Sequence, residues 1–380
     1  MEHEQFEFDR IDRGRDEEIA FIVYEGDPEV YDSGKVLAVV YGRNENEPDA
    51  LENRFLDCDE DKENAIADAL HDIIPNISFF YPAVTRIALK TVNGILTTVI
   101  TEGVDEIVSY LPIPSHLSHI STVPINELRK VTSLDFDVDR VKWKNEAFAF
   151  KKTGEDVAGT IRELTILDKL CNSPNIIDIK AIVVNQDSAI RGFLMPYMHA
   201  GNLEDVFFKV HPDAGVLNVD DKPAIDWSIK LTWARQVAQG VVDLHAIAAY
   251  NGDLKPQNVV LGPTGQAILI DFLSIGFSHD FAAPEVLAKH TDPTLELVLN
   301  GPSDIYSLGL ILYALAEEKA DAARIPLWRD GSAPGWYRDI VQRCLHLDPA
   351  ARPSAVEVLS HLRQEVSEPC VTNKTVVGPV

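Results

Sequence analysis

The chain has 380 residues, enough for two or three domains, and its hydrophobic fraction of 46% is that of a soluble globular protein. Its formal net charge is −26, and residues 1–62 carry twenty acidic residues against seven Lys or Arg, so half of the excess lies there. This acidic front argues against nucleic acid or an anionic membrane as the main partner, and it is compatible with a basic peptide substrate.

Three features of the sequence indicate an intracellular protein. The start of the chain, MEHEQFEFD, lacks the basic and apolar regions of a signal peptide. The longest apolar run, Leu308 to Ala316, is too short to span a bilayer. The cysteines form no C-x-x-C pair, which predicts neither a disulfide framework nor a zinc site: Cys58, Cys171, Cys344 and Cys370. We expect a cytoplasmic or nuclear protein that is neither secreted nor membrane-bound; the sequence predicts no oligomeric state.

The first 120 residues predict a small α+β module that precedes the rest of the chain. Residues 1–20 are highly charged, and we expect them to be poorly ordered. Beyond them, the pattern predicts strands, a polar loop and one helix: strands at 20–24, 36–41, 86–90 and 95–101, a loop at 44–61 and a helix at 61–74. This module, residues 1–120, contains no catalytic constellation.

The stretch 112–121, PIPSHLSHIS, predicts a domain boundary. After it, the pattern favours several strands: 130–136, 140–143, 147–151, 174–182 and 192–197. The third of these ends F-A-F-K. Because side chains alternate along a strand, only one of Lys151 and Lys152 points inward, and Ala149 favours Lys151.

A helix is predicted over 156–171, and it carries an acid beside its apolar stripe. Glu163, Leu167 and Leu170 are spaced i, i+4, i+7, so the carboxylate lies in line with core leucines. A carboxylate in that position needs a cation, and Lys151 is the candidate.

A long amphipathic helix over 226–245 leads into the stretch on which the functional argument depends, residues 250–272. Asp253, Lys255 and Asn258 lie in one polar turn, D-L-K-P-Q-N, and a predicted hairpin over 259–270 returns Asp271 to a place beside Asn258. Phosphoryl transfer needs these parts: an acid for the hydroxyl, oxygens for magnesium and a cation for the moving charge.

These motifs resemble those of protein kinases. The stretch 250–272 is similar to the catalytic loop HRDLKxxN and the magnesium loop DFG, and F-A-F-K with Glu163 is similar to the kinase lysine–glutamate pair. Ala283-Pro284-Glu285, Asp304 to Gly309 and Arg352-Pro353 follow in the kinase order. The resemblance covers about residues 122–365 and is nearest to divergent kinase-like proteins of fungi.

The resemblance implies an α+β, two-lobed protein kinase fold preceded by the N-terminal module. The small lobe would cover residues 122–199, the large lobe 200–365 and a flexible tail 366–380. The implied function is ATP- and Mg²⁺-dependent phosphorylation of Ser or Thr in a protein substrate. Asp253 would orient and deprotonate the hydroxyl, Lys255 would steady the phosphoryl group, and Asn258 with Asp271 would hold Mg²⁺.

Other residues acquire roles from the same resemblance. Six would bind or position ATP: Lys151, Glu163, Ala149, Met195, Met198 and Val260. Met195 would be the gatekeeper and Met198 the hinge residue that meets adenine, although both methionines also suit a hydrophobic core. Glu285 would pair with Arg352, and Asp304 would hold the backbone of the catalytic loop.

The chain departs from the kinase pattern at four places. D-F-D-V-D-R at 135–140 replaces the glycine-rich loop, Asn251-Gly252 replaces His-Arg, Leu273 replaces the glycine of DFG, and the activation segment is short. These changes predict weak ATP binding. With glycine in place of the arginine and no Lys or Arg at 274–282, we expect no control by phosphorylation of Ser274 or Ser278.

Two alternatives remain open. A small-molecule kinase of the aminoglycoside or choline phosphotransferase kind would share Asn251-Gly252-Asp253 and a short activation segment, but it lacks the set Lys255, Glu285, Asp304 and Arg352. A pseudokinase that acts as a binding module would explain the missing glycine loop, but the intact acids oppose it.

Overall fold

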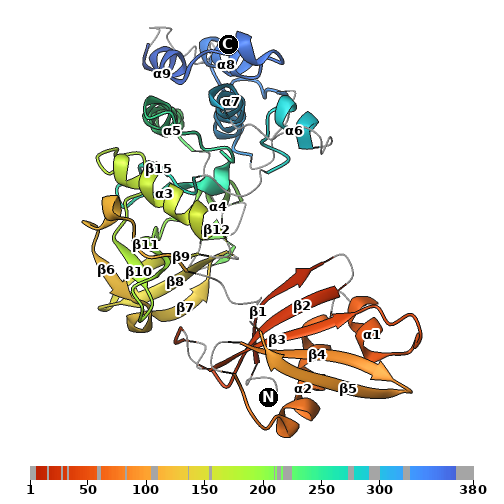
Figure 1. Cartoon of the computed structure of the whole chain (residues 1–380). Helices are drawn as coiled ribbons and strands as arrows, with labels where there is room; N and C mark the ends of the chain where they lie inside the picture. The colour runs from red at the N-terminus through yellow and green to blue at the C-terminus, as the bar shows by residue number, and fades with distance from the viewer. Residues whose placement is uncertain are drawn as a thin grey trace, which may run out of the picture. The chain divides into compact units, whose positions relative to one another are not determined.

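The computed structural model describes the following parts of the chain: residues 6–14, 17–26, 29–31, 34–57, 61–81, 84–103, 110–135, 137–153, 156–208, 210–211, 215–216, 225–272, 278–290, 300–319 and 326–364. Figure 1 labels their helices and strands. The chain forms two compact units, Met1–Val157 with Lys180–Met195, and Ala158–Ile179 with Pro196–Val380.

The first unit begins with a five-stranded sheet in the order β1-β2-β3-β4-β5 (Figure 1). Its strands are β1 Phe6–Arg13, β2 Glu17–Tyr24, β3 Lys35–Gly42, β4 Thr85–Val92 and β5 Ile95–Glu102. All neighbours are antiparallel except β3 and β4. Because a parallel pair needs a long crossover, the connection from β3 to β4 has room for α1 (Leu51–Asp57) and α2 (Lys62–Ile73).

Two predictions for this module were wrong. Residues 6–13 form β1, although the segment is highly charged: Phe6, Phe8 and Ile11 pack on the core of the module, and a register shift between Phe8 and Arg10 keeps all three on it. Residues 51–57 form α1 where we expected a loop. The helix has only seven residues, and its buried face includes Glu52 and Asn53 beside Phe55, so its apolar pattern is too short to be recognised in the sequence.

The same unit holds a six-stranded sheet in the order β6-β10-β11-β9-β8-β7. Its strands are β6 Thr122–Pro124, β7 Arg129–Ser133, β8 Val138–Trp143, β9 Glu146–Lys152, β10 Ala181–Val184 and β11 Ile190–Pro196. The strand predicted over 174–182 starts only at Ala181. Ile176 makes a single bridge to Leu269 instead, so this apolar stretch is buried without joining the six-stranded sheet.

The second unit is mainly helical (Figure 1). Its helices are α3 Val157–Lys169, which begins at the border of the two units, α4 Leu203–Phe208, α5 Trp227–Ala246, α6 Pro284–His290, α7 Gly301–Glu317, α8 Gly335–Cys344 and α9 Ala355–Arg363. It also holds two short hairpins, β12 Val210–His211 with β13 Gly215–Val216, and β14 Val259–Leu261 with β15 Ala267–Leu269.

Helix α7 forms the centre of this unit, since every residue from Ser303 to Glu317 is buried. Asn300 caps its first turn in a reciprocal arrangement with Ser303.

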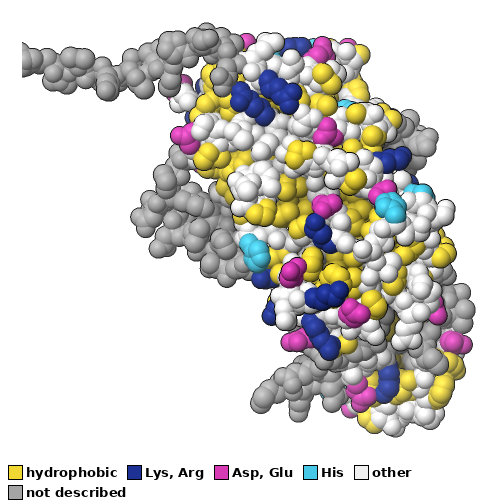
Figure 2. Space-filling model, turned by 90° about the vertical axis from the view of Figure 1, so that its left-hand side faces the viewer, with side chains coloured by type: hydrophobic (Ala, Val, Ile, Leu, Met, Phe, Trp, Pro, Cys, Tyr) yellow, Lys and Arg dark blue, Asp and Glu magenta, His cyan; other side chains and the backbone are white. Residues whose placement is uncertain are grey.

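Although α7 is buried along its length, no helix in the described ranges is long and apolar enough to cross a membrane. On the face drawn in Figure 2, basic and acidic side chains lie interspersed among the coloured residues, so neither sign dominates it despite the net charge.

Candidate functional site

The β14–β15 hairpin brings the two predicted magnesium ligands together. Val259 pairs with Leu269, and the amide of Ile270 donates to the carbonyl oxygen of Asn258 at 3.0 Å. This pairing places Asn258 Nδ2 at 3.5 Å from Asp271 Oδ2. The hairpin therefore does what its sequence pattern predicted: it joins residues at its two ends.

The polar turn before the hairpin is rigidified by its own side chains. The Asp253 amide donates to Asn251 Oδ1 at 3.1 Å, and Asn258 Nδ2 donates to the Asp253 carbonyl oxygen at 2.9 Å. Gly252 has φ +80°, in the left-handed region that favours glycine. Asp253 itself is buried, which orients its carboxylate.

Asp304 of helix α7 binds the backbone of this turn, as the resemblance predicted. The Asp304 carboxylate accepts hydrogen bonds from the amides of Asn251 and Gly252, both at 2.9 Å. His245 Nε2, at the end of α5, lies 3.0 Å from the same group. Asp304 is only 1% exposed, so these bonds compensate the burial of its charge.

Asp253 and Lys255 converge on a hydroxyl. Lys255 Nζ lies 2.7 Å from Asp253 Oδ2 and donates to Ser278 Oγ at 2.8 Å. The Ser278 amide donates to Asp253 Oδ1 at 2.5 Å, and Ser278 Oγ lies 3.4 Å from Asp253 Oδ2. An alcohol thus sits between a carboxylate and a cation, the arrangement that hydroxyl activation requires.

Ser278 was predicted only as a possible site of phosphorylation, and its contact with Asp253 and Lys255 was not predicted. The sequence feature that could have predicted the contact is the short activation segment, because it keeps Ser278 close to the loop that contains Asp253. Leu273 and Ser274 lie outside the described residues.

Asp271 has a strained backbone and is followed by a contact to α3. Its φ is +61°, unusual for a residue other than glycine, and such strain is typical of functional sites. The next amide, that of Phe272, donates to Glu163 Oε1 at 3.0 Å. Glu163 is buried, so the acid that we expected to need a cation also accepts from the backbone beside Asp271. Its pairing with Lys151 stays a prediction.

Strand β9 separates its two lysines as predicted. Phe148 and Phe150 lie in a hydrophobic core, and Lys152 shares their face, because its ammonium lies 3.5 Å from Asp139 Oδ2. Ala149 and Lys151 lie on the opposite face. Asp139, which registers with Phe150, therefore points away from the side of Lys151.

The β7–β8 turn, at the place of a glycine-rich loop, forms hydrogen bonds within itself. The amides of Leu134 and Asp135 both donate to the Val138 carbonyl oxygen, at 2.8 and 3.0 Å, and the Val138 amide donates to Asp135 at 3.3 Å. Amides that are already bonded in a turn are poor donors to a phosphate.

Three further residues were predicted to contact the nucleotide. Met195 is buried in β11, while Met198 follows that strand half-buried and Val260 lies half-buried in β14. Their assembly around adenine stays a prediction.

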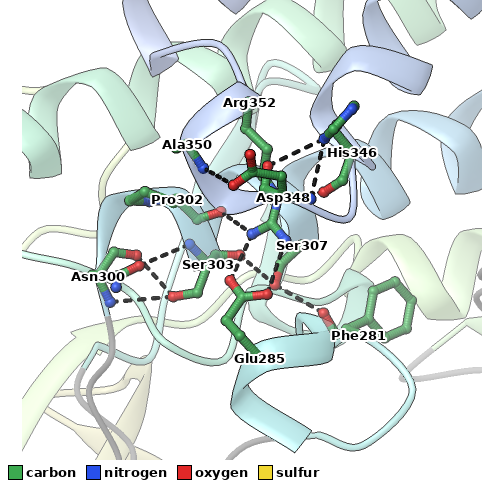
Figure 3. A network of polar contacts seen from close by, with 10 residues as sticks. All are labelled: Phe281, Glu285, Asn300, Pro302, Ser303, Ser307, His346, Asp348, Ala350 and Arg352. Atoms are coloured by element: carbon green, nitrogen blue, oxygen red, sulfur yellow. Dashed lines mark hydrogen bonds and ion pairs between the residues drawn. The ribbon is translucent and has the colours of Figure 1, made fainter. Parts of the chain in front are cut away.

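A second network anchors the chain after the site (Figure 3). Arg352 donates from both terminal nitrogens to Glu285, at 2.6 and 2.8 Å, and also to the carbonyl oxygens of Pro302 and His346, at 2.8 Å each. Ser307 donates to the Phe281 carbonyl oxygen at 2.8 Å. The predicted pair of Glu285 and Arg352 is confirmed, and it fixes the start of α6 to α7.

Comparison with known families matches residues 139–362 to the protein kinase domain, more than half of the chain. The chain belongs to the protein kinase family. The predicted family and fold are confirmed: the matched region comprises the β-rich part from β8 to β11 and the helical part that follows it.

Several curated kinases are similar to this protein. Serine/threonine-protein kinase dst4 of Dictyostelium discoideum is 26% identical over 57% of this chain and 48% of its own length. Serine/threonine-protein kinase TAO3 of Mus musculus is 27% identical over 57% of this chain and 25% of its own. Dual specificity testis-specific protein kinase 2 of Homo sapiens is 24% identical over 56% and 40%. The chain thus spans half or less of the length of the relatives it matches.

Proposed function

We propose that this protein is an ATP- and Mg²⁺-dependent kinase that phosphorylates Ser or Thr in proteins. The observation that carries the proposal is the convergence of Asp253 and Lys255 on the hydroxyl of Ser278, because it shows that the two groups can hold an alcohol between them. The names of several relatives support Ser/Thr specificity.

The chemistry follows from these positions. Asp253 orients the acceptor hydroxyl, whose oxygen attacks the γ-phosphorus of ATP while the bond from that phosphorus to the β,γ-bridging oxygen breaks. ADP leaves, and the hydroxyl proton passes to Asp253 and then to water. Lys255, which already lies at hydrogen-bonding distance from Asp253 and from a hydroxyl, faces the charge of the transferred group.

Magnesium fits the donor set. In the described part of the chain there is no group of three or more His, Cys, Asp or Glu that could enclose a metal, but Mg²⁺ is commonly held by one or two protein oxygens with phosphates and water. Asn258 Nδ2 donates to the Asp253 carbonyl oxygen, so its Oδ1 is the atom left for a cation beside Asp271. When bound, the metal would neutralise charge on the phosphates.

By the kinase resemblance, Lys151 and Glu163 would position the α and β phosphates, and Ala149, Met195, Met198 and Val260 would contact the adenosine. Because the β7–β8 turn bonds its own amides, we infer that Lys151 and Mg²⁺ provide most of the phosphate affinity.

We also propose that phosphorylation of the activation segment does not switch this kinase on. Ser278 Oγ is engaged by Lys255, and a phosphate on it would face the Asp253 carboxylate. Lys255 would be drawn from Asp253 to that phosphate, and Gly252 offers no second cation.

Transfer of labelled γ-phosphate tests the proposal. Wild-type protein should label generic protein in preference to small alcohols, and Asp253→Asn should abolish labelling. Labelling of small alcohols alone would favour the small-molecule kinase. ATP binding without transfer to any acceptor would favour the pseudokinase.

A further inference from the structure

The connection between β2 and β3 of the N-terminal module extends the six-stranded sheet. The Lys130 amide donates to the Glu29 carbonyl oxygen at 2.9 Å, and Val30 makes an antiparallel bridge to Arg129. Since β7 is the last strand of that sheet, residues 29–31 cover part of its edge. The module is therefore bonded to the hairpin that stands where kinases carry their glycine-rich loop.

Tyr31 ends this segment and reaches a buried charge. Its hydroxyl donates to Asp139 Oδ2 at 2.6 Å, and its ring lies edge-on to Phe150, with the centroids 5.2 Å apart. Asp139 is 0% exposed; Ser133 donates to its other oxygen at 2.9 Å, and Lys152 lies 3.5 Å away. Burial, with the neighbouring Asp139 carboxylate, raises the pKa of Tyr31, so the phenol remains a donor.

Asp139 connects the Tyr31 hydrogen bond to the β7–β8 turn and to the pairing of β8 with β9. It directly follows Val138, the residue that closes the β7–β8 turn and that registers with Lys151 on β9. Asp139 itself registers with Phe150. A donor that fixes Asp139 from the face of the sheet that carries Phe150 consequently fixes both the turn and the strand pair that carries Lys151.

We propose that Tyr31 is a positioning residue, through which the N-terminal module clamps the β7–β8 hairpin and the β8–β9 register at Lys151. Its effect on ATP rests on the proposed function, whereas the clamp is a property of the free protein. Among the partners of Asp139 in the described part of the chain, Tyr31 is the one supplied by the module, so this bond couples the module to the kinase domain.

Hydrogen exchange on the full chain without nucleotide tests the clamp. Tyr31→Phe keeps the ring against Phe150 and removes only the hydroxyl. We expect amides of residues 129–152 to exchange about tenfold faster or more, since a hydrogen bond to a charged group is typically worth that factor. Amides of α5 and α7 should be unchanged. The matched control is Tyr24→Phe, whose hydroxyl bonds to Glu25 in the same module at 3.0 Å.

A second measurement separates positioning from support of the fold. Tyr31→Phe should raise the Kd for MgATP several-fold and the KM for ATP in parallel, with kcat at saturating ATP nearly unchanged; Tyr24→Phe should alter neither. Unchanged exchange at 129–152, or faster exchange with an unaltered Kd, would overturn the inference. Wild-type protein that binds no ATP would overturn the proposed function instead, and the exchange result alone would then decide the clamp.

Discussion

Replacing Arg352 with lysine keeps the positive charge but removes the planar guanidinium that four hydrogen bonds use. Arg352 bonds both oxygens of Glu285 and the carbonyl oxygens of Pro302 and His346, and its side chain is 0% exposed. A lysine ammonium is a single point with three donors, so it cannot serve partners that lie on different sides of the guanidinium. Water cannot replace the lost hydrogen bonds at the place of the guanidinium, because the Arg352 side chain is not exposed to solvent.

The size of the effect follows from this burial. Lysine keeps a charge opposite Glu285 but leaves buried acceptors without a donor, which typically costs about 1–3 kcal/mol, and we expect Arg352→Lys to destabilise the helical unit by about that amount. Glu285→Gln is the matched change on the other side. Glu285→Gln leaves the buried guanidinium without an opposite charge, which typically costs about 3–5 kcal/mol, and the 27% exposure of the Glu285 side chain favours the lower end of that range.

Urea unfolding followed by tryptophan fluorescence measures both losses. Four of the five tryptophans, Trp227, Trp233, Trp328 and Trp336, lie in the helical unit, so the signal reports mainly on it. The order of the two variants is the critical result. If Glu285→Gln cost less than Arg352→Lys, or less than about 1 kcal/mol, the reasoning from the buried guanidinium would be refuted.

Four further outcomes are expected. Asp253→Asn should lower phosphoryl transfer by about 10²- to 10⁴-fold and leave the Kd for MgATP nearly unchanged, as measured by transfer of label and by calorimetry. Lys151→Met, and separately chelation of magnesium, should remove most of the thermal stabilisation by ATP, since the β7–β8 turn offers bonded amides. Phosphatase treatment should leave activity unchanged, because the Ser278 hydroxyl is already bonded to Lys255. Burial raises the pKa of Cys344 to about 12, so iodoacetamide at pH 8 should label exposed Cys171 in the native protein and spare Cys344.

Each of these expectations has a contrary result. Tight ATP binding without metal and without Lys151 would show that the phosphates are held elsewhere. A large loss of activity after phosphatase treatment, with folding intact, would identify a phosphoswitch. Native labelling of Cys344 would mean that α8 opens readily.

The features predicted from sequence were those with a local pattern or an ordered set of motifs. The turn at Asp253 and the hairpin that returns Asp271 to Asn258 follow from proline, glycine and short apolar runs, and the structure contains both. Glu285 with Arg352 is distant in sequence, and it was predicted only because the kinase motifs occur in order.

The features that sequence analysis missed depend on contacts without a local signature. Strand β1 has its core residues separated by charges and a register shift, and the short helix α1 buries Glu52 against Thr91 beside its few apolar residues. Tyr31 meets Asp139 across 108 positions of sequence. No periodicity within a short window reports such pairings, because they arise only when the sheets are formed.

The closed β7–β8 turn has a consequence for how the kinase would respond to its surroundings. A nucleotide gains affinity from its terminal phosphates when backbone amides receive them, and here the amides of Leu134, Asp135 and Val138 are bonded within the turn. ATP and ADP should therefore compete on nearly equal terms. An enzyme of this kind slows as ADP accumulates, so its rate would follow the energy charge of the cell rather than the concentration of ATP alone.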